Sequence, residues 1–511
     1  MGNPLLRTKS IEQSLADTDE PGHQLRKDLS VRDLIVFGVA VVIGAGIFTV
    51  TVSQAGNNAG PAISLSFVMA AITCGLAALC YAEFASTVPV AGSAYTFGYA
   101  TFGEFLAWIL GWDLILEFAV GAATVAKGWS GYLDNLVHSF FPHAPKDINS
   151  VSIGGIDLDW GAVAVVALVT TLLAIGTKLS SRFSAVITAI KIGVVLLVIV
   201  LGFFYIKTAN YTPYVPPAEG GGGAHKSVDS SLFSLITGAG NTQYGWYGVL
   251  AAASVVFFAF IGFDVVATTA EETRNPKRDI PRGILGSLAI VTVLYVLVTV
   301  VVSGMVDYRR LAGTGKDSKN LADVFALNGV TWAEKVIAIG ALAGLTTVVM
   351  VLILGQSRVL FAMCRDGLLP RRMARTSPRF GTPARLTVMI GVAVAVVAGL
   401  FPIHRLEEMV NVGTLFAFVV VAGAVMVLRR TRPDLPRGFV VPGGPVIPIL
   451  AILACAWLML NLSALTWIRF VVWMAIGVVV YFLYGQRHSM VGRRERGEVP
   501  AWDSRTDDTI A

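Results

Sequence analysis

The residues of this chain best suited by type and spacing to bind a ligand interrupt two long apolar runs. Val42-Ile43-Gly44-Ala45-Gly46-Ile47-Phe48 breaks the first run, and Phe258-Ala259-Phe260-Ile261-Gly262-Phe263-Asp264 breaks a later one at a matching place. Backbone that leaves the helical form inside a bilayer strands N–H and C=O groups at a cost of several kcal/mol each, unless these groups line a cavity and meet a ligand. The paired interruptions therefore predict a binding site near the middle of a membrane.

Helix polarity at the two interruptions indicates what would bind there. The outer half of the first helix begins near Ile47 and presents its positive N-terminal end to the gap, which favours a carboxylate. The sixth helix runs the opposite way, so its outer half ends near Phe258 and offers backbone carbonyls to a cation. An α-amino acid satisfies both ends, whereas close helix packing through glycine is the alternative interpretation of either interruption alone. The candidate substrate-binding residues of the two interruptions are Ile43, Gly44, Ala45, Gly46, Ile47, Phe258, Ala259 and Ile261.

Three carboxyl groups lie at or near membrane depth, where an ionisable side chain is expensive and by default indicates a function. Glu117 is about 12 residues into the third span, hence roughly 18 Å deep. We expect it to face the substrate cavity, and the alternative is a carboxyl that locks helices together. Asp113, one turn earlier, shares that face and is expected in a gate or an ion pair. Asp264 starts the inner half of the sixth helix, where it can cap the helix, contribute to the substrate site, or do both.

Lys191 is the candidate for proton coupling. It lies about eight residues inside the fifth span, or roughly 12 Å from the cytoplasmic end, a distance over which lysine can also snorkel to the interface. If it faces the bundle interior, desolvation favours the neutral amine, so the ammonium group could lose and regain a proton during a transport cycle.

The elements that must position these residues are membrane helices. A composition of 55% hydrophobic and 14% charged residues, with a mean hydropathy of +0.70, excludes a soluble globular domain. Apolar windows of about 20 residues predict an all-α polytopic membrane protein of about 12 transmembrane helices. Ten of them would form a 5+5 inverted repeat with broken first and sixth helices, and two C-terminal helices follow. The predicted spans begin near residues 33, 62, 104, 159, 183, 246, 283, 334, 385, 408, 446 and 467.

The chain divides into segments that follow from these spans. They are a cytoplasmic N-terminal segment (1–31), a first five-helix repeat (32–206), an external linker (207–245), a second five-helix repeat (246–430), two additional helices (431–486) and a cytoplasmic tail (487–511). The N-terminal segment does not resemble a cleaved signal peptide. The tail is charged and poor in apolar side chains, so we expect it to be disordered.

Basic residues indicate the orientation in the membrane. Most lysine and arginine falls in segments that lie on one side if the N-terminus is cytoplasmic, whereas the long segment 134–158 on the other side has only Lys146. Segment 307–332 is an exception, because it carries four basic residues and is assigned outside. We therefore predict a multi-pass protein of the plasma membrane with both termini cytoplasmic. A pI near 9.1 does not indicate nucleic-acid binding, since the charges flank membrane spans.

An ordered set of motifs carries a family resemblance that covers nearly the whole chain. The motifs are Gly44-Ala45-Gly46-Ile47-Phe48, Gly111-Trp112-Asp113-Leu114-Ile115-Leu116-Glu117, Ala259-Phe260-Ile261-Gly262-Phe263-Asp264, Glu271-Glu272-Thr273-Arg274-Asn275-Pro276, Arg358-Val359-Leu360-Phe361-Ala362-Met363, Asp366-Gly367-Leu368-Leu369-Pro370 and Gly413-Thr414-Leu415. This set resembles the cationic amino acid transporter family, within the amino acid, polyamine and organocation superfamily. Mammalian members have two more helices than we count here, and the shorter layout is similar to that of bacterial relatives.

The resemblance implies the five-plus-five fold and alternating access, and it places a site glutamate at Glu117. It also implies a role for Lys191, because proton-coupled bacterial relatives have a lysine where sodium-coupled cousins hold their cation, beside the unwound first helix. Eukaryotic facilitators of the family have an uncharged residue there. Family likeness favours arginine, lysine or ornithine as substrate, with Glu117 or Asp264 as the counter-charge.

The predicted function is secondary active uptake of amino acids, cationic by preference, by alternating access with proton coupling. The alternative is a small neutral amino acid/H+ symporter or an amino acid exchanger. An ion channel would need a filter contributed by symmetric subunits. An enzyme would need a catalytic constellation, and the six histidines form no convincing metal or general-base set. We expect no metal, no cofactor and no nucleic-acid partner; the expected partners are the amino acid, protons and membrane lipids, and the sequence does not indicate an oligomeric state.

Overall fold

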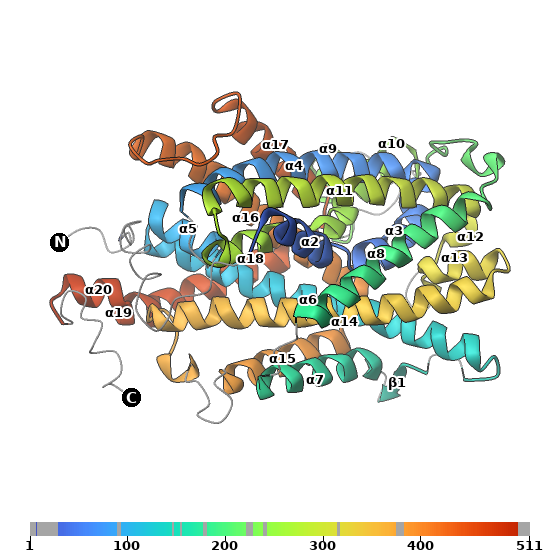
Figure 1. The fold of residues 1–511 in the computed structure, drawn as a ribbon, viewed down its shortest axis with the longest axis horizontal. Coiled ribbons are helices and arrows are strands. Elements are labelled where there is room, and N and C mark those ends of the chain that lie inside the picture. The colour runs from blue at the N-terminus through green and yellow to red at the C-terminus, as the bar shows by residue number, and fades with distance from the viewer. Residues whose placement is uncertain are drawn as a thin grey trace.

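The computed structural model describes residues 7, 29–88, 93–145, 148–153, 156–176, 181–220, 228–238, 243–313, 317–374 and 383–498. Within them the chain is almost entirely helical, and most long helices run lengthwise through one bundle (Figure 1). The predicted all-α class is confirmed. Eight helical stretches of the described chain are long and apolar enough to cross a membrane. Three further apolar helices, α7, α15 and α17, are shorter, so the count of 12 spans stays a prediction.

Helices occur at each predicted span. The long helices are α4 (Ile63–Thr87), α6 (Glu104–Phe140), α8 (Ser181–Phe203), α11 (Pro276–Met305), α14 (Thr331–Arg365), α16 (Ile403–Thr431) and α18 (Ala464–Val480). The shorter apolar helices are α7 (Trp160–Ile175), α15 (Ala384–Leu400) and α17 (Val446–Leu460). Connecting elements are α5 (Ser93–Thr101), α9 (Leu232–Thr237), α12 (Tyr308–Leu311), α13 (Leu321–Leu327), α19 (Gln486–His488), α20 (Met490–Glu495) and the antiparallel hairpin of β1 (Ser150–Ile153) and β2 (Ile156–Asp159).

The first predicted interruption is confirmed. Helix α2 (Val31–Val42) ends in extended backbone at Ile43, with φ −68° and ψ 94°. The chain resumes in the π-helix η2 (Gly46–Val50) and continues through α3 (Thr51–Gln54) and a second π-helix, η3 (Ala55–Ala59).

The second predicted interruption is also confirmed. Helix α10 (Gly245–Val256) tightens into the 3-10 turn η6 (Phe257–Phe260), and Ile261 is extended at φ −63° and ψ 139°. Gly262 then has φ +111°, a conformation that glycine adopts without the steric penalty of a Cβ. The inner half continues as η7 (Phe263–Glu272), a 3-10 helix throughout.

Helices α4 and α11 make the main contacts with the broken segments, and α6 joins a second group of packed helices. Helix α6 packs against α14 and α16, α14 also packs against α8, and α11 packs against α2 and η7. Because α6 and α14 are the longest helices of the described chain, they cross the whole bundle.

Segments predicted to be cytoplasmic, among them α5, α19 and α20, meet at one end of the bundle, opposite α12 and α13 (Figure 1). The N–H of Arg274 donates to the carbonyl of Leu29 at 3.1 Å, and the N–H of Glu104 donates to the carbonyl of Arg7 at 2.8 Å. The grouping agrees with the predicted topology.

The beginning of the predicted tail is ordered, contrary to our expectation. Residues 486–495 form α19 and α20, and the N–H of Met490 donates to the carbonyl of Asp366 at 3.0 Å. The Glu104 carboxylate accepts hydrogen bonds from the hydroxyls of Tyr481 and Ser489. These hydrogen bonds hold the start of the tail against the bundle, although its composition predicted a solvated, disordered segment. Residues 499–511, most of 1–31 and the glycines at 221–223 lie outside the described residues.

Candidate substrate site

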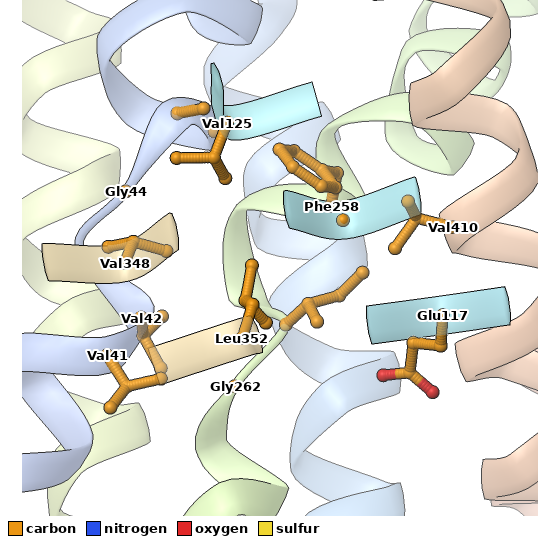
Figure 2. A pocket seen from close by; sticks show the side chains of 14 residues that line it. Val41, Val42, Gly44, Glu117, Val125, Phe258, Gly262, Val348, Leu352 and Val410 are labelled. Carbon is orange, nitrogen blue, oxygen red and sulfur yellow. The ribbon is translucent and has the colours of Figure 1, made fainter. Parts of the chain in front are cut away.

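A pocket lies where the two interruptions face each other inside the bundle. It is a small, partly enclosed space that is lined mainly by apolar groups. Figure 2 shows Glu117 as the one labelled acidic side chain, among valine, leucine and phenylalanine side chains and beside the backbone at Gly44 and Gly262. The lining residues are Val41, Val42, Gly44, Ala45, Gly46, Glu117, Gly121, Val125, Phe258, Ile261, Gly262, Val348, Leu352 and Val410.

The pocket brings together six of the predicted site residues. Gly44, Ala45, Gly46, Glu117, Phe258 and Ile261 line it. Ile43, Ile47, Ala259 and Asp264 are buried but are not among its lining residues. The side chains of Ile43 and Ile47 pack in the core, so only the backbone groups of these two residues could contact a ligand.

Ala259 lies at the contact between the two interruptions. It lies directly against Gly46, so that a Cβ on Gly46 would overlap with the Ala259 Cα. The glycine therefore lets the backbones of the two interruptions touch. This contact fixes the distance between the two helix ends that would recognise a ligand.

Side chains from other helices hold the first interruption open. The Tyr295 hydroxyl donates to the carbonyl of Val42 at 2.8 Å, and the Lys191 ammonium donates to the carbonyl of Ala40 at 2.9 Å. Both carbonyls belong to the last turn of α2, where no following helical N–H can reach them. On the outer side, the Tyr132 hydroxyl donates to the carbonyl of Phe48 at 2.6 Å. The break is thus stabilised without ligand by groups on α6, α8 and α11.

The second interruption is held from α16. The Asn411 side-chain amide donates to the carbonyls of Ser254 and Val255, at 2.8 and 3.1 Å. The carbonyl of Phe258 accepts from the N–H of Ile261 at 3.3 Å. Because a carbonyl has two lone pairs, the Phe258 oxygen keeps acceptor capacity for a ligand ammonium group.

Glu117, Asp264 and Asp113 form a group of buried carboxyls, with exposed fractions of 3%, 3% and 0%. Glu117 and Asp264 are close enough to repel each other electrostatically, as are Glu117 and Asp113, and Thr414 lies beside Glu117. Both Asp113 oxygens and the Oδ1 of Asp264 have no hydrogen-bond partner within the described chain. The ion pair expected for Asp113 is not found there. Burying an unpaired negative charge is expensive. The three carboxyls can lower this cost by binding a proton or a cationic ligand.

The apolar walls of the pocket are the part that sequence inspection missed. Val348 and Leu352 come from α14, Val125 and Gly121 from α6, and Val410 from α16. Valine and leucine in a membrane helix look the same in sequence whether they face a pocket, a neighbouring helix or lipid. Asn411 carries a signal that could have been used, because a polar amide at membrane depth indicates a partner.

Comparison with known proteins gives a consistent result across the chain. The model of the amino acid permease family matches residues 29–491. The branched-chain amino acid permease of Bacillus subtilis is 41% identical over 96% of this chain and 100% of its own length. A methylthioribose transporter of the same organism is 39% identical, over 96% of this chain and 99% of its own. Human cationic amino acid transporter 4 is 30% identical, over 96% of this chain and 91% of its own.

Proposed function

The chain belongs to the amino acid permease family, and from this premise we propose that it is a secondary active transporter that takes up amino acids across the plasma membrane by alternating access. Both termini lie in the cytoplasm and protons drive the uptake. The observation that carries the proposal is the pocket between the two interruptions. A positive helix end at Gly46 and backbone carbonyls near Phe258 meet there, and they suit the α-carboxylate and the α-ammonium group of one amino acid.

The pocket walls favour an apolar, branched side chain. Val125, Val348, Leu352 and Val410 face the space beyond the two helix ends (Figure 2). Each substrate methylene buried there contributes about 0.8 kcal/mol, whereas a charged side chain has to give up its hydration. We therefore place leucine, isoleucine and valine first, in line with the name of the branched-chain relative.

Cationic amino acids are the second candidate, because Glu117 lines the pocket and Asp264 lies near it. A lysine or arginine side chain would pair with these carboxyls, and the more distant relatives include cationic amino acid transporters. Among the described residues neither carboxyl forms an ion pair with a basic side chain, which is unusual in an apolar site. This is the specific observation in favour of the cationic substrate.

Competition decides between the two substrate classes. Purified protein in proteoliposomes would take up labelled leucine while an excess of one unlabelled compound is present. We expect isoleucine and valine to compete at least about tenfold better than arginine, lysine or ornithine, which corresponds to about 1.4 kcal/mol. The reverse order would establish the cationic substrate. Effective competition by methylthioribose, which lacks the α-amino and carboxylate groups, would contradict recognition by the two helix ends.

Proton coupling is proposed to depend on Lys191. Its side chain is 2% exposed, so it lies inside the bundle and does not extend to the interface as a snorkelling lysine would. Its ammonium group meets the last turn of α2, the negative end of that half-helix. Loss of the proton would leave a weaker hydrogen bond from a neutral amine and loosen the hold on the inner half of the first helix, which must move when the site opens inward.

Glu117 and Glu83 are both buried glutamates, yet their substitutions should have different effects. Glu83 forms an ion pair with Arg429 that joins α4 to the end of α16, and it accepts from the N–H of Val441 at 2.7 Å. Glu117→Gln should lower substrate affinity or turnover by about tenfold while the melting temperature stays near that of the parent, because one hydrogen-bonding charge is lost from the pocket. Glu83→Gln should instead lower the melting temperature, because the half-buried Arg429 loses its charged partner. Ligand titration and thermal unfolding in detergent measure both quantities. Equal losses of affinity in the two variants would return Glu117 to a structural role.

A further inference from the structure

A glycine pair on α14 lies against the helix that carries Lys191. Gly340 and Gly344 are four residues apart and therefore share one face of α14. That face meets α8: a Cβ on Gly340 would overlap with the Val194 side chain, and a Cβ on Gly344 would meet the Lys191 side chain. Small residues with this spacing commonly let two membrane helices approach closely.

Gly344 differs from Gly340 in what fills the space above it. An added Cβ would lie 2.9 Å from Cγ, 3.0 Å from Cε and 3.4 Å from Cδ of Lys191. Three stem carbons thus lie along the bare glycine, and the stem crosses α14 here before its ammonium group reaches the Ala40 carbonyl at 2.9 Å. The slot therefore sets both the path and the reach of the lysine.

The path of the lysine stem is the main constraint on where the Lys191 ammonium group lies. Helices α14, α11 and α2 pack against α8. Their charged residues lie toward the helix ends, and α11 adds the Tyr295 hydroxyl, which donates to Val42. These charged residues are Arg32 and Asp33 on α2, Lys277, Arg278, Asp279 and Arg282 on α11, and Glu334, Lys335, Arg358 and Arg365 on α14. The pH response of Lys191 therefore depends on its one carbonyl acceptor and on how well the stem presents the ammonium group to it.

We infer that Gly344 is a positioning residue for proton coupling: its missing side chain forms the slot that aims Lys191 at the broken end of the first helix. The inference rests on the coupling role proposed for Lys191. It goes beyond that role, because it assigns part of the coupling geometry to a helix that carries no titratable group at this level of the described chain. In Gly344→Ala, the lysine stem has to shift by a few tenths of an ångström or more, and the ammonium group loses alignment with Ala40.

Gly344→Ala tests this with Gly340→Ala as the matched control, because both add one methyl group to the same face of α14. In proteoliposomes with an imposed pH difference, Gly344→Ala should lose most of its gradient-driven accumulation while substrate exchange continues. The ammonium form of Lys191 loses its acceptor in this variant, so a higher proton concentration is needed to protonate the lysine. The midpoint of the pH profile should therefore move to lower pH by about one unit. Gly340→Ala should keep the midpoint of the parent.

The Lys191→Ala background separates positioning from general damage to the helix contact. Without the lysine stem, the methyl group has nothing to displace, so Gly344→Ala should cause no further change in accumulation or pH profile there. If the pH profile of Gly344→Ala has the same midpoint as that of the parent, or if both glycine variants shift the midpoint equally, the positioning role of Gly344 is wrong. Full accumulation in Lys191→Ala alone would instead overturn the proposed coupling role, and the two failures are thus distinguishable.

Discussion

Leucine in place of Gly46 is expected to abolish amino acid binding and transport while the protein still inserts and folds. The reason is the contact between the two interruptions, where even a Cβ at this position would overlap with the backbone of Ala259. A leucine side chain would push the two helix ends apart and enter the pocket that Gly46 lines. Overpacking of this kind costs about 3 kcal/mol, which corresponds to a loss of affinity of roughly a hundredfold.

Gly75→Leu is the control for this substitution, because a Cβ at Gly75 would meet nothing within 4 Å. Both variants would be purified, checked for a single folded species by size-exclusion chromatography, and titrated with leucine and with arginine. The Gly75 variant should bind like the parent. Unchanged affinity in Gly46→Leu for whichever amino acid the parent binds would show that the site does not lie between the two interruptions.

Much of the fold could be predicted because membrane insertion imposes simple constraints on sequence. Apolar length identifies the spans, and glycine in a polar kink identifies where the first and sixth helices break. The breaks at Ile43 and Gly262 follow from local properties. Helix α2 ends before Ile43, and the break at Gly262 needs a positive φ, which glycine adopts easily. Both are properties of the residue itself, so a single sequence contains them.

The substrate-selecting part of the site could not be predicted, because it depends on which face of a helix meets the cavity. Val348 and Leu352 are one turn apart on α14, and they line the pocket only through the way α14 packs on α6. Val336 and Ile339 are on the same helix and equally apolar, but they are exposed on the outside of the bundle. Asp264 illustrates the same limit, since it is buried near Glu117 and yet is not among the residues that line the pocket.

Lys191→Ala is expected to abolish accumulation driven by a proton gradient and to leave substrate exchange largely intact. The substitution removes the ammonium group that contacts the broken end of α2, so inward opening no longer depends on its proton. In proteoliposomes without sodium and with the membrane potential held at zero, an inward pH difference of about one unit should let the parent accumulate a neutral amino acid about tenfold, if one proton moves with each substrate. The variant should only equilibrate it.

Two further variants make the result specific to the charge. Lys191→Met keeps most of the volume of the side chain without its proton, so it should uncouple the carrier as Lys191→Ala does, while avoiding the cavity that alanine leaves. Lys127→Ala removes a lysine that pairs with Asp159 at 3.2 Å away from the pocket, and it should accumulate substrate like the parent. Accumulation that persists in both Lys191 variants, or that requires sodium in the parent, would show that Lys191 only packs against α2. Uncoupling in both, with exchange retained, would assign the coupling to the ammonium group and its contact with Ala40, because both variants lack that group.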